Sequence, residues 1–236
     1  MKVSVIIPAH NEEEYLPGGL TAVAAAAEIC PGEVETVVVL NRCTDRTEEI
    51  AREAGVVTVR EDSKNLSLIR NAGVAASTGE IVVTIDADSH LHPHFLRIAV
   101  EKLNSGTFIG GGAFVFPERW SLGIIASGLM LFPYLAKYRL SFAAFWTTRK
   151  AFDAINGFNP DFVTIEDVDF AIRLREYGHT EGKKWGTVWS APITTSCRKF
   201  DQYGDWHLVR DRGFLKRAFT GRDREIANEY WYDQRG

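Results

Sequence analysis

The chain has 236 residues, of which 45% are hydrophobic and 25% are charged, and its formal net charge at pH 7 is −4. This length and composition predict one large α/β domain with a sizeable core, or at most two small domains. The slightly acidic balance and the lack of a lysine-rich stripe argue against nucleic-acid binding.

The first hundred residues alternate between apolar strands and helices. The pattern predicts strands over 3–7, 34–40, 56–59 and 80–85, and helices over 13–29, 44–54, 65–76 and 93–103. Near-continuous apolar strands joined by helical crossovers are typical of an α/β fold with a mostly parallel sheet and helices on both faces. Ligands of such sheets bind at the carboxyl ends of the strands, so the polar loops there are expected to face one crevice.

The second half of the chain is less regular. Strands are expected over 107–116 and 142–148, and an amphipathic helix over 166–177. The uncharged run 120–136 is shorter than the roughly 20 residues that a membrane-spanning helix needs, and Pro133 interrupts it. Two interpretations stay open: a helix that is buried or lines an acceptor cleft, and an interfacial helix near a lipid-linked substrate.

The location of the protein is suggested by its start and its cysteines. The first strand begins by Val3, and no cleavable signal segment precedes it. The three cysteines are far apart and odd in number, which fits neither a zinc nor a disulfide framework and is consistent with a reducing compartment. We expect a cytoplasmic protein that is either free or peripheral to a membrane, and a single domain over 1–236, because no linker divides the sequence.

The strand over 81–85 runs directly into Asp86-Ala87-Asp88. An ionised carboxylate is costly to bury unpaired, so these aspartates are expected at the open end of the strand, facing something positive. Two carboxylates one residue apart suit a hard divalent cation that also holds phosphates. The alternative is an ordinary acidic turn that caps the following helix.

The loop after the first strand indicates which phosphate ligands are excluded. A dinucleotide site would need a Gly-x-Gly-x-x-Gly turn there, but the loop reads PAHNEE and contains no glycine. No Walker A lysine loop is present either. A metal on Asp86 and Asp88 would then have to neutralise the phosphates, which favours a sugar nucleotide over a dinucleotide or ATP.

Five stretches of the sequence, in order and spacing, resemble the family 2 glycosyltransferases, which have the GT-A fold. They cover about the first 180 residues: PAHNEE at 8–13, NRCTDRT at 41–47, RNAGVAASTGEIVVTIDAD at 70–88, GFNPDF at 157–162 and EDVDFAIRLREYG at 166–178. The resemblance implies a nucleotide-sugar-binding half over 1–105 and an acceptor-binding half with the C-terminal tail over 106–236.

The resemblance also implies how the nucleotide is bound. Pro8, His10 and Glu12 belong to a loop that would pass beneath the nucleotide, with Glu12 near the ribose or base. Asn41 stands where the family usually has an aspartate that reads the base edge. An amide can both donate and accept, so this residue does not decide between uridine and guanosine. The alternative for Glu12 is an ordinary acidic residue in a first helical turn.

The remaining matched residues are those for the diphosphate and the reaction. Arg70 would approach the diphosphate, Asp86 would lie near the ribose, and Asp88 would bind Mg²⁺ or Mn²⁺. Asp167 resembles the catalytic base, and its neighbour Glu166 could raise its pKa by like-charge repulsion. Sugar transfer needs such a base for the acceptor proton and a charge sink for the departing diphosphate. The alternatives are helix capping for the acidic pair and a surface position for Arg70.

Histidines supply a further candidate metal ligand. Some GT-A enzymes complete the cation shell with a late histidine, and His207 is the candidate here; the alternative is a packing or exposed side chain. His90, His92 and His94 follow the Asp-x-Asp pair at alternate positions, but Pro93 and the expected helix start disfavour their convergence on one metal.

The leading hypothesis is an inverting, metal-dependent hexosyltransferase that moves one sugar from a nucleoside-diphosphate sugar to an acceptor hydroxyl. The polymer-forming enzymes of the family that the sequence resembles carry a Gln-x-x-Arg-Trp motif and membrane helices; neither is found after the acidic pair, so a single sugar transfer is expected. The acceptor is not specified by the sequence; the apolar run suggests a lipid-linked or otherwise apolar molecule. The alternatives are a catalytically silent nucleotide-sugar-binding module and a sugar nucleotidyltransferase.

Overall fold

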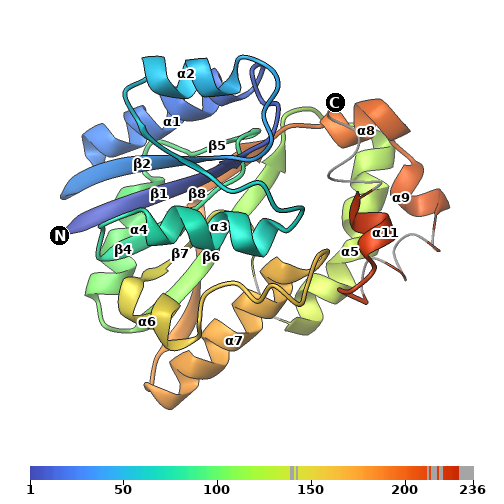
Figure 1. The fold of residues 1–236 in the computed structure, drawn as a ribbon. Helices are drawn as coiled ribbons and strands as arrows, with labels where there is room; N and C mark the ends of the chain where they lie inside the picture. Colours follow the sequence, from blue (N-terminus) through green and yellow to red (C-terminus); the bar gives the residue numbers. More distant parts are fainter. Residues whose placement is uncertain (139–140, 142, 212, 214–216, 218–219, 229–236) are drawn as a thin grey trace.

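A computed structural model describes residues 1–138, 141, 143–211, 213, 217 and 220–228 of the chain. The described residues form one eight-stranded sheet with the order β3-β2-β1-β4-β7-β6-β8-β5 (Figure 1). The first four strands are parallel to one another. β7 is antiparallel to both β4 and β6, β6 and β8 are parallel, and β5 is antiparallel to β8.

The sequence-based predictions of strands and helices in the first hundred residues are confirmed. The strands of the sheet are β1 Lys2–Ala9, β2 Glu33–Leu40, β3 Val57–Arg60, β4 Ile81–Thr84, β5 Ser89–His90, β6 Phe108–Pro117, β7 Phe145–Thr148 and β8 Lys184–Thr195. The helices are α1 Leu16–Ile29, α2 Thr47–Glu53, α3 Leu66–Ala75, α4 Phe95–Asn104, α5 Leu122–Tyr138, α6 Arg149–Ala154, α7 Glu166–Thr180, α8 Arg198–Tyr203, α9 His207–Arg210 and α11 Arg224–Ala227.

Two hydrophobic cores hold helices on opposite faces of the sheet. Alternate residues of β1, including Val5, belong to a core with α1 and α4, whereas Ile6 belongs to a core with α3, α6 and α7. This is the period-2 alternation that a strand buried on both faces requires. The predicted α/β architecture is therefore confirmed, with every residue of the β4 run Ile81–Thr84 buried.

The longest strand that the sequence does not reveal is β8. It contains Gly186 and Pro192, which weaken a strand signal, and its register with β6 shifts between Ala113 and Val115. Proline cannot donate a ladder hydrogen bond, so an irregularity of pairing accommodates it. β8 nevertheless matters for the site, because its end is hydrogen-bonded to β5 just after Asp88.

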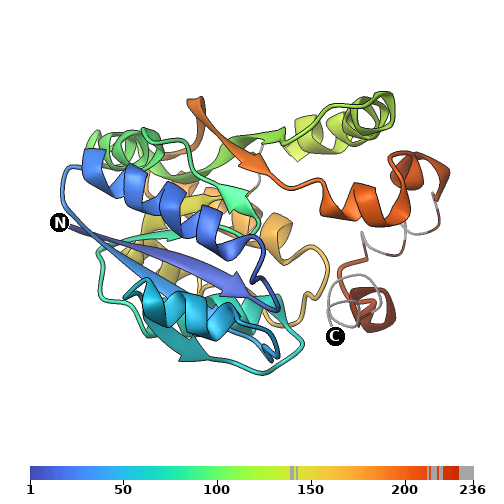
Figure 2. The ribbon, with the colours of Figure 1, turned by 90° about the horizontal axis from the view of Figure 1, so that it is seen from above.

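The helix expected over 120–136 is present as α5, which buries Ile124 and Ser127 on one side and exposes large apolar side chains on another. Leu122, Leu129 and Phe132 are 78%, 70% and 64% exposed. α5 is therefore only partly buried: it follows β6 beyond the main sheet and packs against the short helix α9 (Figures 1 and 2). A helix that lines an acceptor cleft and an interfacial helix both stay predictions. Among the described residues, no helix is both long and apolar enough to cross a membrane.

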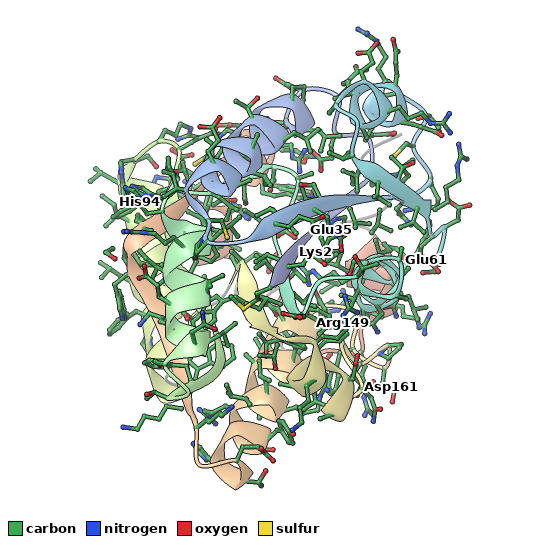
Figure 3. All side chains as sticks on the ribbon, turned by 90° about the vertical axis from the view of Figure 1, so that its left-hand side faces the viewer. Lys2, Glu35, Glu61, His94, Arg149 and Asp161 are labelled. Atoms are coloured by element: carbon green, nitrogen blue, oxygen red, sulfur yellow. The ribbon has the colours of Figure 1, made fainter. Side chains whose placement is uncertain are left out.

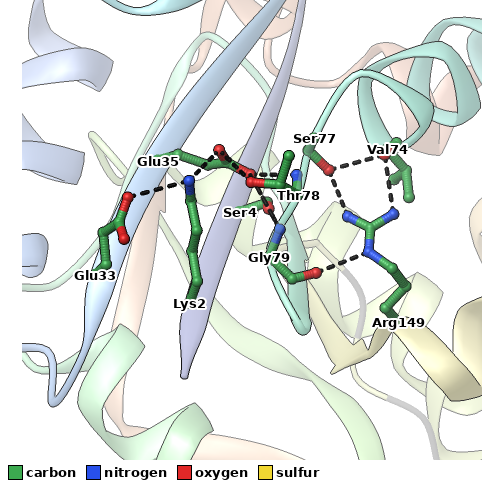
Figure 4. A network of polar contacts seen from close by, with 9 residues as sticks. All are labelled: Lys2, Ser4, Glu33, Glu35, Val74, Ser77, Thr78, Gly79 and Arg149. Carbon is green, nitrogen blue, oxygen red and sulfur yellow. Dashed lines mark hydrogen bonds and ion pairs between the residues drawn. The ribbon is translucent and has the colours of Figure 1, made fainter.

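The amino ends of the central strands are joined by a polar network (Figures 3 and 4). The Glu35 carboxylate accepts hydrogen bonds from the Ser4 hydroxyl at 2.6 Å and the Thr78 amide at 2.5 Å, and it pairs with Lys2 at 2.8 Å. Arg149 donates to the carbonyls of Gly79 and Val74 nearby. Burial alone would raise the pKa of Glu35, but bonds from Lys2, Ser4 and Thr78 outweigh it and lower this pKa to about 2.

The Glu35 network predicts an acid-dependent loss of stability. A carboxyl whose pKa falls from 4.5 to about 2 on folding stabilises the folded state above pH 4.5, by about 3 kcal/mol, and loses this contribution as the pH falls toward 2. We expect Glu35→Gln to lower the free energy of unfolding in urea at neutral pH, with more than half of the difference from wild type gone near pH 3. Glu33→Gln, at an exposed partner of Lys2, should change little; equal effects of the two variants would contradict this assignment.

Candidate active site

One cavity lies at the carboxyl ends of the parallel strands, where the sequence predicts the site. It is lined by Pro8, Ala9, His10, Glu12, Asn41, Leu66, Ile69, Asp86, Ala87, Asp88, Arg198 and Lys199. The structure therefore brings together all six predicted residues of the first, second and fourth strand loops. Arg198 and Lys199, at the start of α8, were not anticipated from the sequence.

The loops after β1 and β2 are tied to each other by hydrogen bonds. The Asn11 side chain accepts from the Thr44 amide at 2.8 Å and donates to the Thr44 hydroxyl at 3.1 Å. The Glu12 amide donates to the Thr47 hydroxyl at 2.7 Å. Asn11 has a φ of +49°, a left-handed conformation that asparagine tolerates better than most residues. The two loops thus form one rigid wall of the cavity.

Asn41 is buried, and its amide hydrogens are already in use. The Nδ2 group donates to the carbonyl oxygens of Glu61 and Ser63, the latter at 2.9 Å, and Oδ1 accepts from the Arg42 guanidinium at 3.3 Å. The side chain therefore fastens the end of β2 to the loop after β3. The resemblance placed Asn41 at the edge of the nucleotide base, where an amide would not decide between uridine and guanosine; in the structure, the donors of this amide are used by the protein backbone.

Arg70 joins the Asp-x-Asp loop to the start of α7. Its Nη2 lies 2.9 Å from Asp86 Oδ1 and its Nη1 lies 2.8 Å from Glu166 Oε1. Arg70 and Glu166 are both buried, and Gly73, one turn further along α3, lets the helix approach Ile6 and Val39 so closely that a Cβ would clash with both side chains. Burial would lower the pKa of Arg70, but the charges of Asp86 and Glu166 outweigh it and raise this pKa.

Asp167 lies beside this network in the first turn of α7. Burial and the adjacent Glu166 carboxylate raise the pKa of Asp167 to about 7, against the opposing effect of the Arg70 guanidinium. Its Oδ1 accepts a 2.7 Å hydrogen bond from the Val168 amide. Asp167 is outside the lining of the cavity itself, yet it is close enough for the charge of Asp86 to act on its pKa. The sequence predicted a raised pKa from the charge of Glu166; in the structure, burial raises the pKa of Asp167 more than Glu166 does.

Arg198 holds the second aspartate of the Asp-x-Asp pair. Its Nη2 lies 3.0 Å from Asp88 Oδ2, and its Nη1 lies 2.9 Å from Glu12 Oε2. The Ser196 hydroxyl donates to the same Asp88 oxygen at 2.9 Å, and the guanidinium lies over the Tyr15 ring. No motif marks Arg198 in the sequence, and β8, which places it beside Asp88, was not predicted from the sequence either. Asp86 is thus paired with Arg70 and Asp88 with Arg198.

The oxygen donors of the cavity fit a divalent cation. Asp86 and Asp88 are the hard oxygen ligands that Mg²⁺ and Mn²⁺ prefer, and both line the cavity together with Glu12. Within the described ranges, no three His, Cys, Asp or Glu side chains come together as a ready-made metal cluster. A cation here would need further ligands from phosphate or water, as Mg²⁺ usually does.

His207 is placed away from this cavity. Its Nδ1 is 2.9 Å from the carbonyl oxygen of Gly204, and its ring packs against the rings of Phe200 and Tyr203. The structure does not bring His207 together with Asp86 and Asp88, so its role as a metal ligand stays a prediction. The three cysteines are free thiols.

Comparison with solved structures identifies the class of fold. The chain superposes on Staphylococcus aureus TarS in complex with UDP-GlcNAc with a TM-score of 0.65, at 16% identity over 100% of this chain and 72% of that one. It superposes on glucosyl-3-phosphoglycerate synthase from Mycobacterium tuberculosis, in complex with Mn²⁺, UDP and glucosyl-3-phosphoglycerate, with a TM-score of 0.63, at 21% identity over 94% and 79%. The fold is that of the GT-A glycosyltransferases.

Sequence comparison identifies the family. The profile of "Glycosyl transferase family 2" matches residues 4–160, and the chain belongs to this family of transferases. An uncharacterized glycosyltransferase of Mycobacterium tuberculosis is 36% identical over 104 residues, which are 44% of each chain. The undecaprenyl-phosphate 4-deoxy-4-formamido-L-arabinose transferase of Aeromonas hydrophila is 31% identical over 119 residues, 46% of this chain and 36% of that one. The match thus spans less than half of these relatives' length.

The hydrogen bonds of Asn41 predict that an aspartate is poorly tolerated at this position. In Asn41→Asp, a carboxylate would face the carbonyl oxygens of Glu61 and Ser63 and could donate to neither. We expect the free energy of unfolding in urea to fall by about 2 kcal/mol. Asn104→Asp, at the exposed end of α4, should change it by less than about 0.5 kcal/mol. An Asn41→Asp variant as stable as wild type would show that these amide hydrogen bonds do not fasten the loop.

Proposed function

We propose that this chain is an inverting, metal-dependent glycosyltransferase that moves one sugar from a nucleoside-diphosphate sugar to an acceptor hydroxyl. The observation that carries the proposal is the ion-pair chain from Asp86 through Arg70 to Glu166, which places a carboxyl group with a pKa of about 7 beside the Asp-x-Asp loop. These ion pairs support the proposal because they hold the proposed base at a fixed separation from the proposed phosphate-binding cavity. The UDP and UDP-GlcNAc complexes of proteins with this fold support a uridine-linked donor.

Asp167 is the proposed general base. In its ionised form, it takes the proton of the acceptor hydroxyl while that oxygen forms a bond to the anomeric carbon of the donor sugar. The bond from this carbon to the diphosphate oxygen breaks on the opposite face, and the nucleoside diphosphate leaves with the bonding electrons. A base whose pKa is near 7 is partly ionised at neutral pH and strong enough to take the proton.

In this proposal, charged residues in and beside the cavity stabilise the negative charge of the donor diphosphate. Asp88 and Asp86 would hold Mg²⁺ or Mn²⁺, which supplies positive charge for the departing diphosphate when it is bound. Arg198 neutralises Glu12 and Asp88 at the cavity wall, and Arg70 does the same for Asp86, so that an anionic ligand meets less repulsion. In this proposal Glu166 is the buried counter-ion of Arg70 and raises the pKa of the base, and does not itself contact the acceptor.

Calorimetric titration of UDP and of GDP, each with Mn²⁺ and again with EDTA, tests the donor site. Binding of one nucleotide that is lost with EDTA would support the metal-bridged site and identify the base. Donor hydrolysis in the presence of Mn²⁺ separates an active enzyme from a silent binding module, and pyrophosphate release from a nucleoside triphosphate and a sugar phosphate would instead support a nucleotidyltransferase. Binding of neither nucleotide would contradict a uridine- or guanosine-linked donor.

The raised pKa of Asp167 predicts the pH dependence of turnover. Only the ionised carboxylate accepts a proton, so kcat/KM should fall about tenfold per pH unit below pH 7. Asp167→Asn should lower kcat by a factor of about 10² to 10⁴ and leave the Kd of the nucleotide nearly unchanged. Asp161→Asn, at an exposed position in the loop before α7, is the matched control. Near-normal turnover in Asp167→Asn would refute the assignment of the base.

Arg198 predicts a separate effect on nucleotide binding. Arg198→Gln leaves Glu12 and Asp88 without their shared cation and makes the cavity more negative. A charge-assisted hydrogen bond is worth about 1.5–3 kcal/mol, so we expect the Kd of the nucleotide to rise roughly ten- to hundredfold. Arg52→Gln, at an exposed arginine of α2, changes the net charge equally and should leave the Kd unaltered. Equal nucleotide affinities of the two variants would exclude this role.

A further inference from the structure

The helix α5 carries a row of exposed apolar side chains. Leu122, Ile125, Leu129 and Phe132 are 78%, 42%, 70% and 64% exposed. Their spacing of three, four and three residues places them along one side of the helix. Such a continuous row of exposed large side chains is unusual for a water-facing helix and marks an interaction surface.

A cluster of exposed aromatic rings continues this surface on β6 and β8. The Phe114 ring lies 5.1 Å from that of Phe116 and 5.2 Å from that of Trp189, and Phe116 lies 6.1 Å from Trp120 at the entrance to α5. Phe114 and Phe116 are two residues apart in a strand, so they share one face of the sheet. We call these four rings together with the exposed row of α5 the aromatic–apolar face.

The charges around the aromatic–apolar face are unevenly distributed. No charged residue stands between Arg119 and Lys137 in the sequence, and Arg119 itself pairs with Asp201 and Asp205. The described residues of 207–228 include four arginines against three acidic residues, and Arg217 pairs with Asp223 and Glu225. The helix α9, which ends at Arg210, packs against α5, and both views place α5, α9 and α11 on the same side of the molecule (Figures 1 and 2).

We propose that the aromatic–apolar face docks on the surface of an anionic lipid bilayer. Tryptophan rings favour the membrane–water interface, and basic residues beside an apolar helix are attracted to anionic headgroups. α5 is too short and too near the rest of the domain to cross the bilayer, which fits a helix that lies in the plane of the interface.

The position of the face relative to the cavity supports a lipid surface as the partner. Trp120 follows Glu118 and Arg119, and the Glu118 carboxylate accepts a 2.6 Å hydrogen bond from the Cys197 amide, next to Arg198 in the cavity wall. The face therefore begins at the border of the cavity. A molecule anchored in the bilayer would have its polar end near the site. Docking itself does not depend on the proposed sugar transfer.

Sedimentation with lipid vesicles tests this proposal. We expect the protein to sediment with vesicles of phosphatidylcholine containing about 30% phosphatidylglycerol, to bind pure phosphatidylcholine more weakly, and to be released in part by high salt. The double variant Leu122→Asp/Leu129→Asp should lose at least tenfold in partitioning. Val57→Asp, at an exposed apolar position on β3 at the other edge of the sheet, is the matched control.

Two further measurements separate lipid docking from misfolding of the variant and from self-association. The Kd of the nucleotide, measured without lipid, should be the same in wild type and in the double variant. Equal values show that the variant is folded. They also test the donor site independently of lipid docking. Tryptophan fluorescence should shift to shorter wavelength on addition of the anionic vesicles in wild type only. The proposal is overturned if wild type does not bind these vesicles, if the double variant binds them equally well, or if wild type instead forms a dimer that the double variant abolishes.

Discussion

The buried guanidinium of Arg70 lies between Asp86 and Glu166, two carboxylates that are 80 residues apart in the sequence. Charges taken out of water need partners, so these pairs fix α3, the end of β4 and the start of α7 relative to one another. One guanidinium beside Asp86, Glu166 and Asp167 leaves an excess of negative charge. Burial makes this excess costly, and the pKa of Asp167 rises as a result.

The same principle applies to Arg198, which lines the cavity. Arg198 is shared by Glu12 and Asp88, so each aspartate of the Asp-x-Asp pair is held by its own arginine. The cavity is rich in carboxylates without being strongly negative, because the two guanidinium groups offset them. In the proposed function, an anionic donor in this cavity would depend on the arginines as well as on a metal, which would connect the family's acidic motif to basic residues from other parts of the chain.

Polar and apolar surfaces are separated on this fold according to their roles. At the amino ends of the strands, Glu35 and Arg149 bind backbone and side-chain groups of the protein itself and serve stability. At the carboxyl ends, the loops leave their polar groups facing a cavity. Beyond that end, α5 and the rings of β6 and β8 present apolar side chains to the outside. The sheet separates the two ends, so the residues that stabilise the fold at one end can differ from those that line the cavity at the other.

The sequence by itself determined the main strands and helices of the first half, the Asp-x-Asp loop and the acidic start of α7, because period-2 and helical patterns and closely spaced carboxylates are local properties. Only the tertiary structure decided that Arg198 meets Asp88, which depends on β8 pairing with β5, and that the Asn41 amide is used by a neighbouring loop. It also decided that α5 is only partly buried. The sequence pattern of an apolar helix does not differ between a buried and an exposed helix. The ion-pair partner of a charged side chain depends on contacts between distant segments, which no local pattern encodes.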